Sequence, residues 1–471
     1  MRKAVLGSIA AITAGAGLAA GQSPRLPASV MPAPVSVAPG GGMMPGSMDV
    51  GMQMPPDAQP MMPPGGPMPP GGMMPPGPHP GEMGMGGPPG GYYGPQIDHS
   101  SRLAPKFEFY GKALLYFVKA QPTPGPLVTT SAPGAGGILG QPSTQVLFGG
   151  GDFGMGLFSG FDLSGILWRD PDRRIGIELR GMLLEQKTNS IHEYSDSTGQ
   201  PLLARPFFNA DFGINDSILI SFPNAIAGGV DASALTKLYG AEGNLLWNVY
   251  RSCPGDCTLW TFNWLAGFRY LELNEHLSIV QRSTLINGAT AAFDQKVYQA
   301  PASFTIRDDI QALNQFYGGQ IGFNGDVRYG RVYFAGSAKL GIGVMHQRLT
   351  ISGLSSIQDP NTGASSVIRG GILANASNSG RFNNDEFALV PEGTVTMGYN
   401  WTSWFTTTLG YSALYMDQVI RPGDQISRTV SSALIVGHPN YGGPATPVAN
   451  PAFTQSHFWA QGVQIGFVFR W

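Results

Sequence analysis

The chain has 471 residues, with a formal net charge of -2 at pH 7 and a sequence pI of about 6.4. This balance excludes the strongly basic character that would point to nucleic acid as a partner. Charged residues make up only 12% of the chain, against roughly 25% in an ordinary soluble domain, and the mean hydropathy of -0.02 excludes a bundle of apolar transmembrane helices.

Residues 1–21 are predicted to be a secretory signal peptide. Arg2 and Lys3 form a charged start, and an apolar stretch rich in alanine and glycine follows up to Ala20, with cleavage expected near Gln22. A transmembrane anchor is the alternative, but the stretch is short and weakly hydrophobic for that role. We therefore expect export across the inner membrane.

Residues 22–105 consist almost entirely of proline, glycine, methionine, alanine and serine. Such a segment cannot bury enough apolar area to offset the entropy of ordering it, which predicts a disordered, partly polyproline-like tether in the periplasm. Paired methionines such as Met43 and Met44 raise the alternatives of Cu(I) binding or adhesion to the cell wall. A biased linker is the favoured interpretation, and no cofactor or metal is expected.

Residues 106–471 show a repeated alternation of apolar and polar side chains, which is the period of a β-strand. Trp264 and Phe268, for example, alternate with Asn263 and Arg269. The last segment, 458–471, has aromatic residues at both ends of its apolar face. Strands that lie between lipid and a wet lumen have this pattern. The terminal Trp471 also resembles the signal read by the outer-membrane barrel assembly machinery.

The links between these segments alternate in length. Short links are expected at Leu163–Arg173, Arg251–Cys257, Gly330 and Asn400, and long links at Ala120–Gly150, Thr188–Thr236, Asn274–Leu313, Thr350–Asp385 and Gln418–Ser456. Short periplasmic turns and long outer loops are typical of outer-membrane barrels.

In hydrocarbon no water satisfies a strand edge, so the sheet must close. The predicted fold is therefore all-β: an antiparallel transmembrane up-and-down β-barrel of about 10 strands. Barrels of 8 or 12 strands are alternatives, since Ile218–Phe222 extends a hairpin in one interpretation, and a weak strand is expected at Asp152–Asp162.

Ten charged residues are predicted to face the lumen. They are Glu108, Lys112, Glu178, Arg180, Glu242, Arg269, Asp326, Arg328, Lys339 and Glu392. Because a barrel of this size has a narrow interior, these charges are expected to pair with one another, largely fill the lumen and keep any conductance small.

The two cysteines, Cys253 and Cys257, lie around a Pro-Gly turn signal between two strand-like segments. A local disulfide is the expected state in an oxidising compartment. A redox-active pair is a weaker alternative, because the spacing is not Cys-x-x-Cys.

No catalytic, cofactor-binding or metal-binding constellation stands out, so the protein is not expected to be an enzyme. His192 with Glu193, or His276 with Glu275, offers a remote hydrolase alternative near the outer rim. Neighbouring strand residues point to opposite faces, so neither pair forms a ready dyad.

Four segments resemble a bacterial family of β-barrel porins, type seven. They are Gly267–His276, Asn314–Gly322, Arg421–Gln425 and His457–Phe467, and the similarity spans roughly Phe107 to Trp471. The resemblance implies an outer-membrane barrel and supplies no catalytic or binding residues.

These observations predict a porin-like outer-membrane barrel that passes small solutes slowly. The alternative is a structural or adhesive envelope protein with a blocked lumen. Outer-membrane lipid and the barrel assembly machinery are the expected partners. Small solutes are a further partner if the lumen is open. The sequence does not predict the oligomeric state.

Overall fold

The computed structural model describes residues 106–471 apart from 124, 254–256 and 449–452. The predicted signal peptide, 1–21, and the predicted tether, 22–105, lie outside the described residues. Among the described residues, no helix has the length and hydrophobicity needed to cross a membrane.

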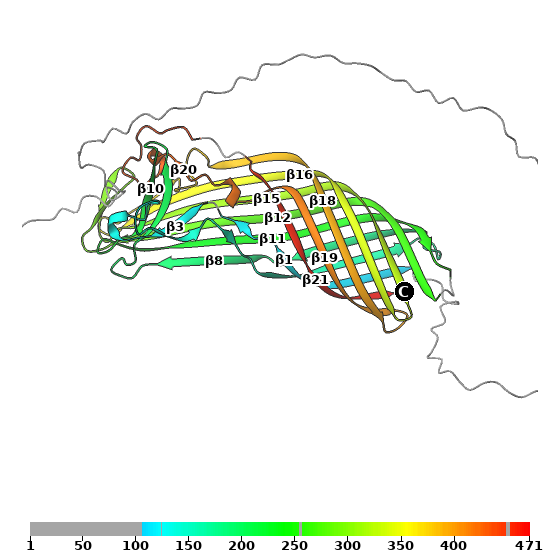
Figure 1. The fold of residues 1–471 in the computed structure, drawn as a ribbon. Coiled ribbons are helices and arrows are strands. Elements are labelled where there is room, and N and C mark those ends of the chain that lie inside the picture. The colour runs from blue at the N-terminus through cyan, green and yellow to red at the C-terminus, as the bar shows by residue number, and fades with distance from the viewer. Residues whose placement is uncertain (1–105, 124, 254–256, 449–452) are drawn as a thin grey trace, which may run out of the picture. The chain divides into compact units, whose positions relative to one another are not determined.

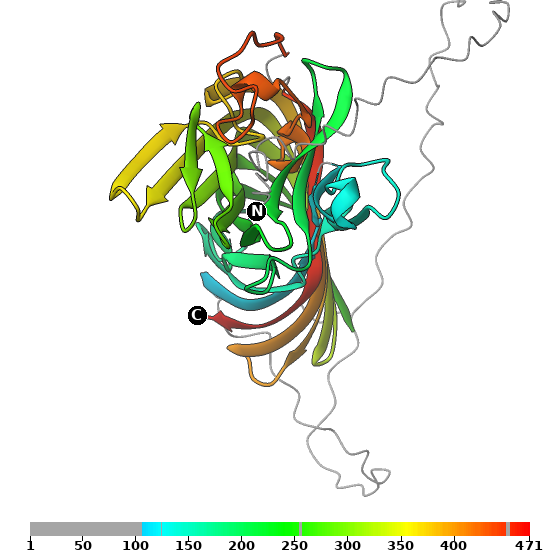
Figure 2. The same ribbon diagram turned by 90° about the vertical axis from the view of Figure 1, so that its left-hand side faces the viewer.

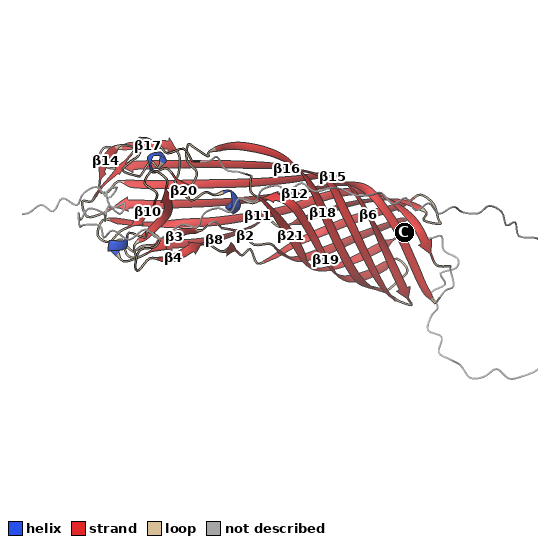
Figure 3. Cartoon of the chain, turned by 45° about the horizontal axis from the view of Figure 1, so that its top comes forward, coloured by secondary structure: helices blue, strands red, loops and turns tan. Residues whose placement is uncertain are grey.

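The main sheet has 12 strands, of which all but β8 and β17 form a closed antiparallel ring (Figures 1 and 3). The ring consists, in chain order, of β1 (Phe107–Val118), β6 (Leu157–Trp168), β7 (Ile175–Leu184), β11 (Ile226–Arg251), β12 (Thr258–Leu285), β15 (Ser303–Tyr329), β16 (Val332–Asp359), β18 (Gly380–Asn400), β19 (Phe405–Ile420) and β21 (Gln455–Arg470). Each strand pairs with its neighbours in the chain, and β21 closes on β1 with Arg470 opposite Glu108. The predicted up-and-down barrel of about ten strands is confirmed.

The turns at one end of the ring are short. Between β15 and β16 only Gly330 and Arg331 intervene, because Tyr329 already pairs with Val332. Gly330 has a φ of 57°, which glycine adopts without the steric cost that a Cβ brings in a two-residue hairpin. This end also carries Phe107 and Arg470, the described strand ends nearest the two termini, so it is the periplasmic end.

One predicted turn is wrong in its bounds. The weak strand expected at Asp152–Asp162 is β6, which begins at Leu157 and runs to Trp168, so the short link starts after Trp168 and not at Leu163. Asp162, the predicted end of the strand, lies within β6 and is buried in the lumen.

Four strands are far longer than a membrane requires. β11, β12, β15 and β16 have 26, 28, 27 and 28 residues, against roughly 9–11 for a transmembrane strand. The predicted long links at Thr188–Thr236, Asn274–Leu313 and Thr350–Asp385 therefore consist largely of strand. β8 (Lys187–Tyr194) pairs with β11 beyond the end of β7, and β17 (Ala364–Arg369) pairs with β16.

The polarity of β12 reverses along its length. In the periplasmic half, Trp264 and Phe268 are exposed while Arg269 is buried. In the outer half, Leu273 and Leu277 are buried with Glu275 between them on the inner face, and Asn274 and His276 lie on the outward face. Hydrocarbon therefore surrounds the first half and water the second, and the polar outward face explains why the outer half looked like loop in the sequence.

A second, five-stranded sheet covers the outer end of the ring (Figure 2). It consists of β3 (Pro126–Thr130), β4 (Gln145–Gly149), β9 (Leu203–Asn209), β10 (Ile214–Ser221) and β20 (Thr429–Val430), which come from three different outer loops. We call this sheet the cap. Ile218–Phe222, considered above as part of a further barrel hairpin, lies largely in β10 of the cap.

The remaining elements are short. They are the paired strands β2 (Gln121–Pro122) and β5 (Asp152–Phe153), the hairpin β13 (Thr290–Phe293) and β14 (Lys296–Gln299), and the 3-10 helices η2 (Pro133–Ala135), η3 (Gly423–Gln425) and η4 (Ser432–Leu434).

The band of exposed apolar side chains around the periplasmic half of the ring identifies the lipid face. Trp264, Phe323 and Phe467 are 52%, 43% and 38% exposed, although all three are large and apolar. On β15 the band runs from Tyr317 to Tyr329, which places Phe323 at its middle.

Two substitutions at adjacent positions test this assignment. Phe323→Arg puts a charge into the middle of the bilayer and should lower the free energy of unfolding by roughly 2–4 kcal/mol. Asn324→Arg should cost far less, because Asn324 lies inside, where it accepts a hydrogen bond from Asn263 at 2.7 Å. Urea titration of the protein refolded in lipid vesicles measures both, and equal losses would contradict the assigned faces.

Candidate functional site

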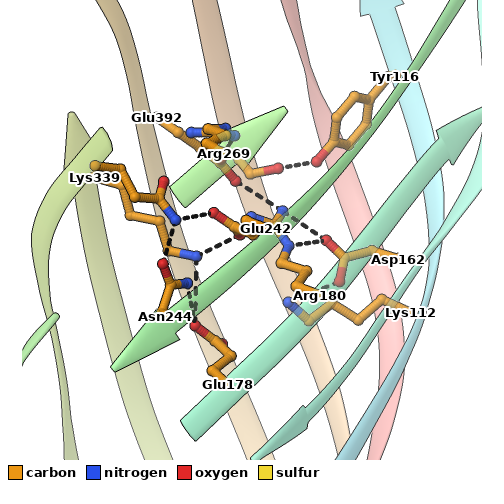
Figure 4. Close-up of polar contacts among 12 residues, drawn as sticks. Lys112, Tyr116, Asp162, Glu178, Arg180, Glu242, Asn244, Arg269, Lys339 and Glu392 are labelled. Atoms are coloured by element: carbon orange, nitrogen blue, oxygen red, sulfur yellow. Dashed lines mark hydrogen bonds and ion pairs between the residues drawn. The ribbon is translucent and has the colours of Figure 1, made fainter. Parts of the chain in front are cut away.

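A network of charged side chains crosses the lumen within the membrane-spanning half of the barrel (Figure 4). Arg180 of β7 lies at its centre. Its guanidinium group is 2.6 Å from Asp162 of β6, 2.7 Å from Glu242 of β11 and 2.8 Å from Glu392 of β18. One side chain therefore joins strands from opposite sides of the ring. We call these residues and their partners below the lumen network.

Further cations complete this network. Lys339 of β16 is 2.7 Å from Glu242 and 3.8 Å from Glu178, and Arg269 of β12 also pairs with Glu392. Lys112 of β1 is 3.9 Å from Asp162. Its charged members are four carboxylates and four cations, so the network has no net formal charge. They are Asp162, Glu178, Glu242, Glu392, Lys112, Arg180, Arg269 and Lys339.

Amide side chains occupy positions between the charges. Gln320 Nε2 donates to Glu242 at 2.5 Å, and Asn244 Nδ2 donates to Glu178 at 2.8 Å. Because each carboxylate can accept several hydrogen bonds, these donors reduce the cost of removing the charges from water. A cavity of about 10 Å³ lies beside Arg180, Glu242 and Arg269, which is room for about one water molecule.

A second cluster lies nearer the periplasmic end. Glu108 binds Arg173 at 2.5 Å and lies 3.9 Å from Arg470, and Arg328 binds Asp326 at 2.6 Å. Glu108, Arg173 and Arg470 are all buried.

Above the lumen network the interior becomes apolar. Leu114, Phe316, Met345, Val390 and Phe458 come from five strands and are almost completely buried. They belong to one hydrophobic cluster that continues into the cap, so the apolar layer and the cap form one core.

Two buried ion pairs hold the loops in the outer mouth. Arg421, at the end of β19, binds Glu275 of β12 at 2.6 Å, with both side chains 0% exposed, and its guanidinium group also donates to the Ala120 carbonyl oxygen at 2.6 Å. Arg205 of the cap binds Asp308 of β15 at 2.6 Å. Asp308 lies inside β15 and is completely buried.

Asp211 joins the cap to the loop between β19 and β21. It accepts hydrogen bonds from Ser432 Oγ at 2.7 Å, Ser431 Oγ at 3.0 Å and the Thr446 backbone nitrogen at 2.9 Å. Burial alone would raise the pKa of Asp211, but these hydrogen bonds outweigh it and hold the pKa below its ordinary value.

The ten sequence-predicted charges fall into two groups. The structure brings Lys112, Glu178, Arg180, Glu242, Arg269, Lys339 and Glu392 into the lumen network, and it places Glu108, Asp326 and Arg328 in the periplasmic cluster. Sequence reasoning missed Asp162 as a member. Its position directly after the outward-facing Phe161 was the available signal.

The predicted disulfide is not present in this structure. Cys253 and Cys257 are both free and exposed. The described ladder between β11 and β12 ends with the hydrogen bond from the Ser252 nitrogen to the Trp260 oxygen at 2.9 Å, so no strand pairing brings the two thiols together.

The histidines of the remote hydrolase alternative pair with aspartates from neighbouring strands. His192 Nδ1 lies 2.6 Å from Asp231, and His276 Nε2 lies 3.2 Å from Asp309. Glu275 is bound on the inner side by Arg421, as the alternation predicts. Among the described residues, no three His, Cys, Asp or Glu side chains gather as a metal site.

The closed ring, the apolar band and the charged interior together define an outer-membrane β-barrel. The sequence profile described as Putative beta barrel porin-7 matches residues 110–471, well over half of the chain. The chain belongs to this family.

The solved structures that match this chain do so with low TM-scores and low sequence identity. The outer membrane protease OmpT from Escherichia coli matches with a TM-score of 0.34 and 9% identity, over 78% of this chain and 96% of that one. Outer-membrane expressed OmpT of Vibrio cholerae matches with a TM-score of 0.11 and 10% identity, over 78% of this chain and 97% of that one. No curated protein matches the sequence.

Removing the central arginine should destabilise the barrel. Arg180→Met leaves three carboxylates without their shared partner, and breaking a buried pair in this way costs about 3–5 kcal/mol. The matched control is Arg282→Met, which removes an arginine paired with Asp231 on the outer surface; it should cost about 0–1 kcal/mol because Arg282 is largely exposed. Urea titration in lipid vesicles compares them, and similar losses would mean that water screens the network.

The contacts of Asp211 predict that the cap loosens in acid. A carboxylate with a lowered pKa stabilises the fold above its ordinary pKa of about 3.9, and this contribution is lost as the pH falls through the folded value. The Ala433 backbone nitrogen also donates to Asp211, at 3.1 Å. Asp211→Ala should speed hydrogen exchange at the Ala433 and Thr446 amides by about 10- to 100-fold at pH 7, the effect of losing roughly 1.5–3 kcal/mol.

In the wild type the same acceleration, relative to the intrinsic exchange rate, should occur only below about pH 4. Asp152→Ala, which removes an exposed carboxylate from another outer loop, is the control and should leave both amides unchanged. Unchanged protection in Asp211→Ala would show that these hydrogen bonds do not hold the loop.

Proposed function

We propose that this protein is a structural envelope protein: a closed barrel that anchors a folded platform at the cell surface. The observation that carries the proposal is that three obstructions lie in series along the interior. These are the lumen network, the apolar layer and the cap. A hydrated solute would have to separate buried ion pairs and then cross a layer without polar partners, and each step has a high cost.

The outer half of the barrel supports the same proposal. Its strands continue well beyond the lipid band, and their inner faces form one hydrophobic core with the cap. A large part of the chain therefore forms a rigid folded body outside the membrane. Such a body is suited to bind other components of the cell envelope. In this proposal residues 22–105 connect the periplasmic end of the barrel to the cell wall, and the protein is not an enzyme.

The second candidate function is slow diffusion of small solutes, which the word porin in the family description favours. It requires the obstructions to move apart, at least transiently. Because charged pairs interact strongly with one another when buried, such an opening would be rare and would give small conductance steps.

Planar-bilayer recording on the full chain separates the two candidates. The wild type should give no single-channel steps. A network variant has Arg180, Arg269, Glu242 and Glu392 all changed to serine, and a mouth variant has Glu275→Ala and Arg421→Ala. Each should remain closed, because the apolar layer persists in both.

The two sets of changes together should also give no steps, because they leave the apolar layer in place. The mouth set removes both members of its ion pair. The network set leaves Asp162 with Lys112 and Glu178 with Lys339, so these buried charges still have partners. Gel mobility with and without heating, which distinguishes folded from unfolded barrels, checks that every variant is folded. Reproducible steps from the wild type would instead favour the diffusion candidate.

A further inference from the structure

Charge is distributed unequally between the two ends of the barrel. In the outer segments 119–156, 185–239, 272–316, 345–389 and 416–457, aspartates and glutamates outnumber lysines and arginines. At the periplasmic turns and strand ends the cations are in excess. The lumen network between them is balanced, so the two ends differ in sign.

Five cations at the periplasmic end are exposed, and we call them the basic rim. They are Lys106, Arg169, Arg174, Arg251 and Arg331. Backbone hydrogen bonds link their positions around the ring: the Lys106 oxygen accepts from Trp168 at 2.8 Å, the Arg174 oxygen from Asn248 at 2.9 Å and the Arg331 oxygen from Asn400 at 2.7 Å. They therefore lie at one level of the barrel.

The basic rim is not neutralised by the protein. Arg174 is 3.5 Å from Asp172, but these side chains are 75% and 74% exposed, so water screens the pair. Lys106, Arg169, Arg251 and Arg331 make no ion pair with any residue that the structure describes. By contrast, Arg470 at the same end faces inward, next to Glu108.

Exposed aromatic residues accompany the basic rim. Tyr250 directly precedes Arg251, and Tyr329 lies two residues before Arg331. Trp260, Trp401 and Trp471 are also exposed at this end. Such aromatic girdles lie at the level of the lipid headgroups, so the rim cations lie where lipid phosphates are.

We propose that the basic rim binds the phosphates of anionic phospholipids, such as phosphatidylglycerol, in the inner leaflet of the outer membrane. A cation near an anionic lipid surface is attracted to it, and several cations at one level add their effects. The excess of carboxylates at the other end opposes direct contact with phosphates there. The same rim would also attract a soluble polyanion, but its position beside the aromatic girdle favours lipid.

Tryptophan quenching by brominated lipids tests this proposal. The chain has 8 tryptophans, and several lie beside the rim. The full chain is refolded in phosphatidylcholine vesicles that contain either brominated phosphatidylglycerol or brominated phosphatidylcholine. Competition between the two should give phosphatidylglycerol a relative association constant of about 5 or more, falling towards 1 in high salt.

Changing Arg169, Arg174, Arg251 and Arg331 to glutamine should bring this ratio close to 1. A matched variant removes the same charge from the outer half, with Lys237, Arg282, Arg348 and Arg381 changed to glutamine, and should keep the wild-type ratio. The salt titration of the wild type tests the proposal independently of how the variants fold. A wild-type association ratio of 1, or an equal fall of the ratio in both variants, would overturn the proposal. A pull-down with isolated cell wall tests a soluble polyanion as the partner instead: retention that depends on the rim arginines, together with a lipid ratio of 1, would also overturn it.

Discussion

The whole barrel depends on one constraint: hydrocarbon offers no partner to a free backbone N–H or C=O group. Antiparallel pairing around the ring meets this constraint, and the pairing of β21 with β1 removes the last open edges. Once the ring is closed, side-chain alternation divides each strand into an outer and an inner face. The apolar band and the charged interior follow from that division.

The reversal of polarity halfway along the long strands defines two environments in one continuous sheet. Below it, outward aromatics meet lipid and inward charges must satisfy one another. Above it, leucine and isoleucine turn inward and pack under the cap as they would in a soluble protein. The buried Arg421–Glu275 pair lies in this outer core and holds the β19–β21 loop against it. A barrel built this way is filled along its length.

The sequence predicted the faces well, because alternation is a local property: Trp264, Phe323 and Phe467 are exposed and all of the predicted network charges face inward. It could not predict that Arg180 meets Glu392, since that contact joins strands far apart in the chain and depends on closure and register. The outer halves of β12 and β15 were taken for loops because polar residues such as His276 and Asp309 occupy their outward face. The alternation of polar and apolar side chains continues there, but the apolar residues face inward and the polar residues outward. A search for strands with an apolar outward face misses such segments.

The unbroken run of β11, β12, β15 and β16 from the periplasmic turns to the cap has a mechanical consequence. The hydrogen bonds between neighbouring strands lie across the strand direction. A force that pulls the cap along the barrel axis therefore loads many of these hydrogen bonds in shear at the same time. Shear distributes force over the entire ladder, whereas peeling concentrates it on one bond. A force applied at the cell surface would thus be transmitted to the membrane through these four continuous strands.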